Sequence, residues 1–406
     1  MPVNRSIVHM DLDTFFVSCE RLLDSRLENK PILIGGTSDR GVVASCSYET
    51  RLFGIHSGMP MKMAKILCPE AVVIRGNTTT YSKYSNNITE IIKENVPVYE
   101  KTSIDEFYID MTGMDKFFGC YKLATEIRKK IIKESGLPIS FGLSENKTVS
   151  KIATGEAKPN NQLQINYGTE KPFLSPLSVK KIPMIGDKTY QELCNLGVKI
   201  IKTIQEMPLE LMEKVFGKNG IVMWKKANGI DNSPVIQHNE RKSVSTERTF
   251  DKDTIDVQKL KTIFTAMAEN LAYQLRQGNK LTSCITVKIR YSDFNTYSLQ
   301  RKIQYTSSDH VLIPVVTSLF NKLYNRRLLV RLIGVRYSGL INGCFQMRLF
   351  EDTYKYYSLY SSIDKLRNRY GERSVIRASG IGAKTIGRGM NPFNGDASLL
   401  LANRKQ

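Results

Sequence analysis

The sequence predicts an α+β protein of several domains, in which two ferredoxin-like units are separated by a helical segment. Two observations support this fold class. At 406 residues the chain is too long for one ordinary hydrophobic core. The predicted order of strand, helix, two strands, helix, strand also occurs twice, which is the order of the split βαβ arrangement.

The first ferredoxin-like unit is expected in the N-terminal 165 residues, interrupted by an insertion at 28–76. Apolar spacing distinguishes its helices from its strands. The last helix must end near Lys158, because Pro159 disfavours helical geometry at the residue before it. The predicted strands are 6–10, 98–103, 106–110 and 140–143, the helices are 14–23, 81–94, 116–134 and 144–158, and the insertion has short strands at 31–36 and 41–45.

The second ferredoxin-like unit follows a helical segment, 178–229, and a polar linker, 230–241. Beyond it we expect one helix at 357–370. The Gly-rich polar end, 380–406, is predicted to be disordered. The predicted strands of the unit are 243–250, 281–291, 297–305 and 330–338, and its helices are 257–277 and 310–324.

The chain is strongly basic, with 59 Lys and Arg against 39 Asp and Glu and a formal net charge of +20. Such an excess favours a polyanionic partner, nucleic acid before anionic membrane. The seven cysteines are scattered without a CxxC pair. This pattern favours a reducing compartment over a disulfide framework or a zinc site. Because no apolar run is long enough to span a bilayer, we expect a cytoplasmic protein.

Three carboxylates are the candidate catalytic residues. Asp11 ends the first predicted strand, and Asp105 and Glu106 lie in the turn of SIDEFYID. We expect the first strand to lie beside the strand that opens this hairpin, so that Asp11 faces Asp105. Carboxylates at one point repel each other unless a cation joins them. Mg²⁺ suits such oxygen ligands, and two ions ~3.5–4 Å apart can promote phosphoryl transfer.

Alternation of side chains limits this prediction. Neighbouring residues on a regular strand face opposite ways, so Asp105 and Glu106 both reach a metal only if the turn breaks the alternation. Of the two, Asp105 is the preferred metal ligand. The alternative is that acids at strand ends and turns are simply solvated, which is the better interpretation for any one residue but not for the set.

Five segments together resemble the Y-family DNA polymerases, over about Ile7 to Phe350. They are HMDLDTFF, VVASCSYETRLFGIHSGM, TSIDEFYID, FGLSENKTVSKIATGEAKP and KSVSTERTF. The resemblance implies a right-hand polymerase with a ferredoxin-like palm and a second ferredoxin-like domain, the little finger. The implied domains are palm 1–27 and 77–165, fingers 28–76, a helix-hairpin-helix thumb 166–232, linker 233–240, little finger 241–345 and tail 346–406.

The resemblance also implies roles at the active site. Two Mg²⁺ ions would be held by Asp11, Asp105, Glu106 and the backbone carbonyl of Leu12. Phe16 would be the steric gate that excludes a 2′-hydroxyl. The alternative is that Phe15 and Phe16 are both core. The implied nucleotide-binding residues are Tyr48, Arg51 and Lys158 at the triphosphate, and Ser45 with Cys46 above the nascent base pair.

Contacts with DNA and with a sliding clamp are implied farther along the chain. Gly186, in IPMIGDK, resembles a phosphate-binding helix-hairpin-helix turn, with an ordinary helix connector as the alternative. Gln346, Leu349 and Phe350 resemble a clamp-binding peptide or are the end of the last strand. One basic face of the little finger is expected from Lys242, Lys288, Arg290, Arg301, Lys302, Arg331 and Arg336.

We therefore expect a monomeric polymerase that adds deoxynucleoside triphosphates to the primer of a primer-template DNA. Low fidelity, translesion synthesis and the absence of a proofreading exonuclease are expected with it. Two alternatives remain open at this point. One is a palm-type nucleotide cyclase, which would need no DNA. The other is a non-catalytic polymerase-like protein that binds DNA or the clamp.

Overall fold

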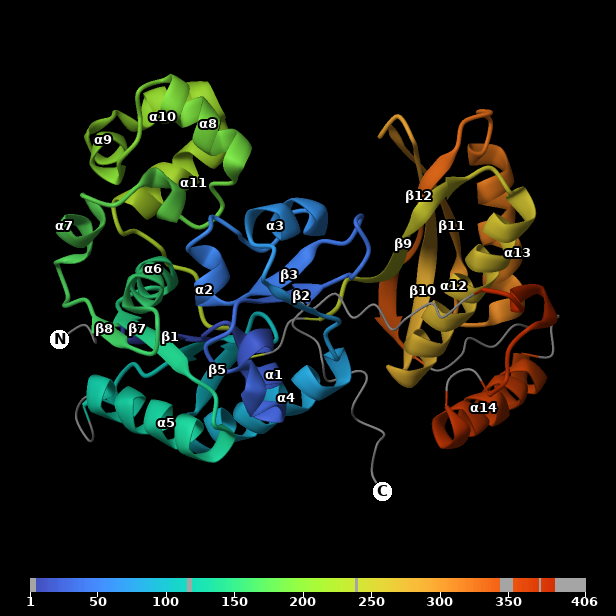
Figure 1. The fold of residues 1–406 in the computed structure, drawn as a ribbon, viewed down its shortest axis with the longest axis horizontal. Helices are drawn as coiled ribbons and strands as arrows, with labels where there is room; N and C mark the ends of the chain where they lie inside the picture. The colour runs from blue at the N-terminus through green and yellow to red at the C-terminus, as the bar shows by residue number, and fades with distance from the viewer. Residues whose placement is uncertain (1–4, 115–118, 238–239, 344–352, 372–373, 384–406) are drawn as a thin grey trace. The chain divides into compact units, whose positions relative to one another are not determined.

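The computed structural model describes residues 5–114, 119–237, 240–343, 353–371 and 374–383 (Figure 1). The described residues form two compact units that divide at Glu240. Each unit combines helices with antiparallel strands, which confirms the α+β class. No helix within these ranges is both long and apolar enough to cross a membrane.

Where the palm is expected, the first unit contains a five-stranded sheet in the order β5-β6-β1-β7-β8. Its first four strands have the ferredoxin-like order, and β8 extends β7 in parallel. The expected neighbour of the first strand was wrong: β1 pairs with β6, the second strand of the hairpin, and β5 lies at the edge. The strands are β1 Ile7–Leu12, β5 Val98–Lys101, β6 Glu106–Asp110, β7 Ile139–Ser144 and β8 Gln162–Gln164.

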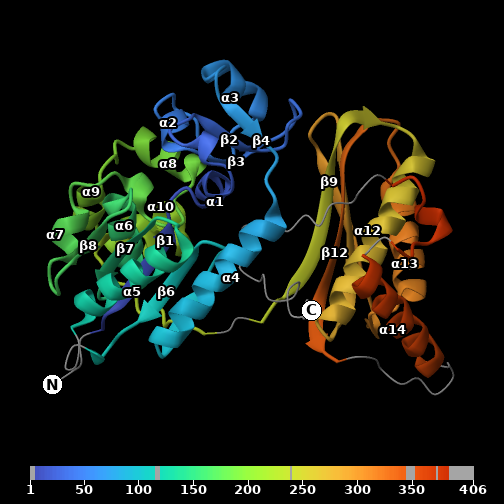
Figure 2. The ribbon, with the colours of Figure 1, turned by 60° about the horizontal axis from the view of Figure 1, so that its bottom comes forward.

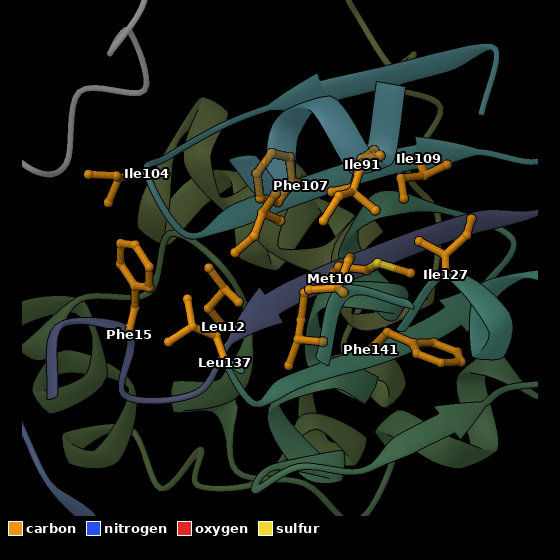
Figure 3. Packing of buried hydrophobic residues seen from close by; sticks show 14 of the residues in the cluster. Met10, Leu12, Phe15, Ile91, Ile104, Phe107, Ile109, Ile127, Leu137 and Phe141 are labelled. Atoms are coloured by element: carbon orange, nitrogen blue, oxygen red, sulfur yellow. The ribbon is translucent and has the colours of Figure 1, made fainter. Parts of the chain in front are cut away.

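The palm sheet has two different faces because side chains alternate along β1. One face lies on the core, and the other, the active face, carries Asp11. Met10 and Leu12 point into a cluster with Phe107, Phe141 and residues of the covering helices, as Figure 3 shows. The intervening residues of β1 point to the opposite face. The helices in this cluster are α1 Phe15–Leu23, α4 Thr78–Asn95 and α5 Cys120–Ser135, and the short 3₁₀ helix η1 Ser25–Leu27 follows α1.

Helix α6, Lys147–Ala157, covers the active face of the palm sheet. A glycine allows this close approach, because a Cβ on Gly142 of β7 would lie 2.3 Å from the Ser150 carbonyl oxygen. Asn146 caps the helix by accepting a hydrogen bond from the Val149 amide. The helix ends at Ala157 and Lys158 is extended, as the following proline predicted.

The insertion at 28–76 forms a small sheet with its own core. Strand β2 lies between β3, which is antiparallel to it, and β4, which is parallel to it. Strand β4 and helices α2 and α3 were not predicted. The elements are β2 Ile32–Gly35, β3 Val43–Cys46, α2 Tyr48–Arg51, α3 Met61–Leu67 and β4 Val72–Ile74.

The predicted helical segment consists of short helices that pack against α6. Val149 and Ile152 of α6 belong to the same apolar cluster as Leu193 and Ile204. The apolar core of this helical segment, the expected thumb, therefore continues onto α6. Helix α7, Glu170–Leu174, precedes the predicted segment and was not expected. The helices within the segment are η3 Val179–Lys181, α8 Asp187–Asn195, α9 Ile201–Glu206, α10 Leu209–Phe216 and α11 Lys218–Ala227.

The second unit has the predicted order of elements but not the ferredoxin-like strand order. Its sheet runs β11-β10-β12-β9, so the first hairpin strand, β10, is central and β11 is an edge. Helices α12 and α13 pack on one face of the sheet. The elements are β9 Ser243–Thr254, α12 Val257–Gln277, β10 Lys280–Tyr291, β11 Thr296–Thr306, α13 Asp309–Leu323 and β12 Val330–Asn342.

Helix α14, Thr353–Tyr370, docks on α12 and α13 through buried charges (Figure 2). Arg276 of α12 donates to Asp364 of α14 at 2.6 Å and to Asp309 of α13 at 2.7 Å. Arg367 of α14 donates to Glu269 of α12. The predicted disorder from 380 was wrong for its first residues, because the 3₁₀ helix η4, Ala378–Gly380, leads to a buried Ala383.

Candidate active site

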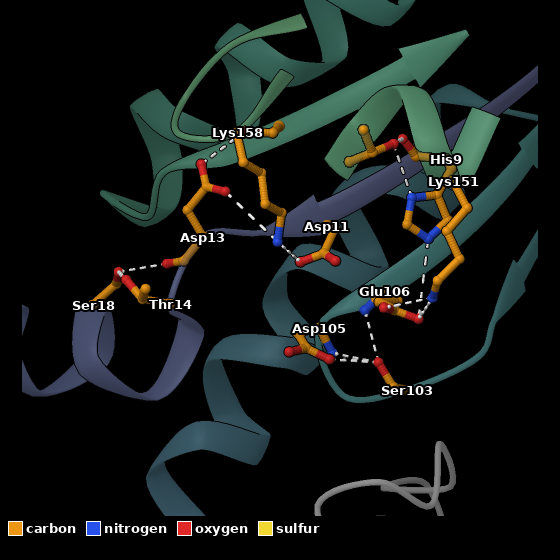
Figure 4. A network of polar contacts seen from close by, with 12 residues as sticks. His9, Asp11, Asp13, Thr14, Ser18, Ser103, Asp105, Glu106, Lys151 and Lys158 are labelled. Carbon is orange, nitrogen blue, oxygen red and sulfur yellow. Dashed lines mark hydrogen bonds and ion pairs between the residues drawn. The ribbon is translucent and has the colours of Figure 1, made fainter. Parts of the chain in front are cut away.

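The three candidate carboxylates converge where β1 meets β6. Asp11 is directly opposite Glu106 in the register of these strands, so both side chains lie on the face covered by α6 (Figure 4). Asp105 precedes β6, which begins at Glu106, and its carbonyl accepts a hydrogen bond from the Leu12 amide at 3.1 Å. Since Asp105 lies outside the strand, alternation does not turn it away from Glu106.

Two lysines of the α6 segment neutralise this acidic cluster. The Lys158 ammonium donates to the Asp11 carboxylate and lies 3.7 Å from Oδ1 of Asp13. The Lys151 ammonium donates to both carboxylate oxygens of Glu106 at 2.7 Å. Asp105 instead accepts a hydrogen bond from the Ser103 hydroxyl. Each acid therefore has a partner within the chain.

Burial makes the charged forms of Asp11 and Asp105 costly. It raises the pKa of Asp11 to about 7, an effect that Lys158 opposes and the carboxylates of Glu106 and Asp105 reinforce. Burial likewise raises the pKa of Asp105, against the hydrogen bond from Ser103. Acids at close range whose charge is disfavoured are the environment in which a cation is bound strongly.

The chemistry of these ligands fits a hard divalent cation. Two aspartates and a glutamate supply only oxygen donors, which Mg²⁺ prefers. Within the described ranges, no three His, Cys, Asp or Glu side chains are grouped closely enough to hold a metal ion as they stand. Two of the three acids are paired with the lysines instead. Cation binding at Asp11 and Glu106 would therefore displace the ammonium groups.

Asp13 links α2 of the insertion to the palm sheet, a role that was not predicted from the sequence. Its side chain is 1% exposed and accepts hydrogen bonds from the Ser140 hydroxyl at 2.8 Å and the Asn160 amide at 2.6 Å. The Tyr48 hydroxyl donates to its other oxygen at 3.4 Å. The Arg51 guanidinium lies 5.0 Å from the centre of the Tyr48 ring. The Tyr48 hydroxyl thus lies beside the carboxylates, and Arg51 lies against the Tyr48 ring.

Phe16 is largely buried at the start of α1. It is 8% exposed, and its ring stacks on Tyr81 with the centroids 4.5 Å apart. Phe15 is 3% exposed and belongs to the same apolar cluster. Both rings therefore pack in the palm core, and the role of Phe16 as a steric gate stays a prediction.

The remaining nucleotide-binding candidate lies in the fingers. Ser45 of β3 is nearly buried and pairs in register with Ile34 of β2. The expectation for Cys46 was wrong, because its side chain is fully buried in the core of the fingers and donates to the Ile55 carbonyl. Cys46 cannot contact a base pair from there.

Gly186 caps the N-terminus of α8 with an extended backbone that any residue can adopt. An added Cβ would meet nothing within 4 Å. The fold of this unit therefore leaves the glycine unexplained, whereas close approach of an outside group would explain it.

The open face of the second unit is basic, but its members differ from the prediction. Lys288 and Arg336 face away from the helices, on the side opposite the buried Val287 and Val335 of their strands. Arg301 was wrongly placed, because it is in register with the buried Ile285 and so lies on the helix side. The other open-face candidates on the strands are Arg290 and Lys302, while Lys242 precedes β9.

Arg331 lies at a register shift in β12, with its guanidinium 4.5 Å from the centre of the Phe294 ring. The open face also carries an acid. A Cβ on Gly334 would lie 2.8 Å from the Glu247 side chain, so this glycine lets Glu247 reach Lys288 across β12. The predicted clamp residues, Gln346, Leu349 and Phe350, lie outside the described residues.

Lys151 and His9 lie in two of the segments that carry the family resemblance, FGLSENKTVSKIATGEAKP and HMDLDTFF, but no role was predicted for either. The spacing of seven residues between Lys151 and Lys158, about two helical turns, was the available signal. His9 shares the active face with Asp11, and burial, with Lys151 and Lys158, lowers its pKa well below the usual value. Its Nε2 lies 4.0 Å from Glu106.

The fold and this acidic site are those of a palm-type polymerase. Family models agree: the impB/mucB/samB family matches residues 10–155, and its C-terminal domain matches residues 241–349. The chain is 37% identical over 375 residues to DNA polymerase IV of Dehalococcoides mccartyi, covering 91% of this chain and 96% of the relative. It is 33% identical over 341 residues to DNA polymerase IV of Treponema denticola, covering 82% and 85%.

Solved structures give the same result. A chimera of the Y-family DNA polymerases Dbh and Dpo4 matches with a TM-score of 0.73 at 26% identity, covering 83% of this chain and all of that one. An insertion ternary complex of Dbh DNA polymerase matches with a TM-score of 0.61 at 26% identity and the same coverage. The chain belongs to the impB/mucB/samB family of Y-family DNA polymerases.

Proposed function

We propose that this chain is a template-directed DNA polymerase that extends a primer with deoxynucleoside triphosphates and synthesises across damaged template bases. The observation that carries the proposal is the convergence of Asp11, Asp105 and Glu106 at one end of the β1–β6 pair, beside Lys158. The relatives and structures named above are polymerases. The cyclase and the non-catalytic alternatives gain no support from them.

The acidic cluster is the proposed binding site of two Mg²⁺ ions, with the Leu12 carbonyl as a further ligand. Bound there, the ions would lower the charge repulsion at the transferred phosphoryl group and activate the primer hydroxyl. The chain itself supplies the rigid oxygen donors. Asp11 is fixed by its place in β1, and Asp105 by the hydrogen bonds of its backbone and side chain.

Side chains around this cluster are proposed to select and hold the nucleotide. Lys158, Arg51 and Tyr48 would bind the triphosphate, since fixed positive charge stabilises the negative charge of the transferred group. Asp13 would hold Tyr48 and Lys158 on the palm side. The edge of Phe16 would exclude a 2′-hydroxyl, and Ser45 would lie over the base pair.

The rest of the proposal concerns DNA and partners. The Gly186 turn and the open basic face, including Lys242, Lys288, Arg290, Arg331 and Arg336, would contact the DNA backbone, where phosphate contacts position the protein without reading sequence. The segment with Gln346, Leu349 and Phe350 is proposed to bind a sliding clamp. We expect a cytoplasmic monomer of low fidelity without proofreading.

The substitution Asp105→Asn tests the proposed site, because it removes one metal ligand and hardly changes side-chain size. Primer extension with Mg²⁺ should fall on the order of a thousandfold, since metal stabilisation contributes several kcal/mol. DNA binding, measured by fluorescence anisotropy, should be unchanged. Asp110→Asn, at the other end of β6, is the matched control and should retain activity. Wild-type extension by Asp105→Asn would refute the assignment.

A further inference from the structure

Lys151 has no part in the function proposed above, yet it makes the closest contacts to one of the three acids. Its ammonium donates to both carboxylate oxygens of Glu106 at 2.7 Å. Two other contacts of this carboxylate are longer: the Thr102 hydroxyl lies at 3.5 Å and Nε2 of His9 at 4.0 Å. Lys151 is therefore the main counter-charge of Glu106 in this structure.

The backbone of Lys151 is fixed by packing rather than by the ion pair. Val149 and Ile152, on either side of Lys151, are buried in the thumb core, and Gly142 lets α6 lie against β7. The side chain of Lys151 is 35% exposed and that of Glu106 is 24% exposed, so both lie at the edge of the site. The backbone of Lys151 therefore stays in place with its helix, and only the flexible side chain has to turn away when Glu106 binds a cation.

One carboxylate cannot give the same oxygens to an ammonium and to a metal ion. We propose that Lys151 is an internal counter-ion of Glu106 that competes with the divalent cation and so sets the cation affinity of the site before DNA binds. It is a positioning residue, because it acts through Glu106. This inference rests on the proposed function, in which Glu106 is a metal ligand. Without a cation, Lys151 limits the repulsion between Glu106 and Asp11.

The test measures Mn²⁺ binding by the full chain without DNA, from the electron paramagnetic resonance signal of free Mn²⁺. Lys151→Met keeps most of the side-chain volume and removes the charge. It should bind Mn²⁺ about tenfold more tightly than wild type, the scale expected for one unit charge a few ångströms from a site near the surface. Lys151→Arg keeps the charge and should stay within about threefold of wild type.

Lys147→Met is the matched control. Lys147 lies one turn earlier on α6 and forms an ion pair with Glu100 of β5, away from the three acids. Its loss should change Mn²⁺ affinity less than about twofold, because a more distant charge is better screened. Circular dichroism verifies the fold of each variant, and Lys151→Gln replaces Lys151→Met if the latter does not fold.

A second readout is thermal unfolding. Saturating Mn²⁺ should raise the unfolding temperature of Lys151→Met more than that of wild type, because the variant loses its counter-charge in the metal-free state. Unchanged or weaker Mn²⁺ binding by Lys151→Met and Lys151→Gln would overturn the inference. Glu106→Gln separates it from the proposed function: wild-type Mn²⁺ affinity in that variant would refute the metal site itself.

Discussion

At the scale of single residues, Phe15 and Phe16 have similar surroundings but different proposed roles. Both rings lie in the palm core, and Phe16 stacks on Tyr81. We predict that Phe16→Ala admits ribonucleotides, because the ring edge no longer blocks the 2′-hydroxyl. Phe15→Ala, the control, should lose about as much stability, ~3 kcal/mol, without a change in sugar selection. Single-nucleotide incorporation of matched deoxy- and ribonucleotides measures sugar selection in both variants. An equal change of sugar selection in the two variants would reject Phe16 as the gate.

The carboxylates of the site could be predicted from the sequence because each lies at the end of a strand or in a turn. Their ion pairs could not. Lys151 and Lys158 approach the acids only because α6 lies against the sheet, which depends on packing at Gly142. Cys46 shows the same limit, since its burial follows from the core of the fingers and not from its neighbours in the sequence.

At the scale of elements, the approach of α6 to β7 depends on the missing side chain of Gly142. Gly142→Ala would place a Cβ 2.3 Å from the Ser150 carbonyl oxygen and 2.6 Å from the Thr154 amide nitrogen. We predict destabilisation of about 1–3 kcal/mol, the usual cost of overpacking, together with reduced primer extension. Urea unfolding and an extension assay measure the two effects.

Gly155 supplies the control for this prediction, since it lies in α6 with nothing within 4 Å of an added Cβ. Gly155→Ala should stabilise the chain by about 0.5–1 kcal/mol through helix propensity. Equal stability of the two alanine variants would contradict the proposed role of Gly142.

The sequence predicted most long helices and strands but not the shortest ones. Strands β4 and β8 have three residues each, too few for a period-two pattern to appear. The strand order of the second unit was also beyond prediction, because the order of elements along the chain is the same for the ferredoxin-like order and for the observed one. Long-range pairing of β12 with both β9 and β10 decides between them.

At the scale of the whole molecule, the net charge of +20 predicts strongly salt-dependent DNA binding. The two faces of the second unit should contribute unequally. Arg336→Ala, on the open face, should lower the slope of log K against log salt by about 1, whereas Arg301→Ala, on the helix side, should leave it unchanged. Anisotropy titrations at several salt concentrations measure the slope, and equal slopes for the two variants would contradict this face assignment.

Helix α14 has a practical consequence for anyone who shortens this chain. The matched C-terminal domain ends at residue 349, before α14 begins. A truncation there would leave Glu269 without its arginine and Arg276 without one of its aspartates. The same truncation would uncover the surface of α12 and α13 against which α14 docks. A chain truncated at residue 349 would therefore expose this surface together with its unpaired charges, and we expect it to aggregate.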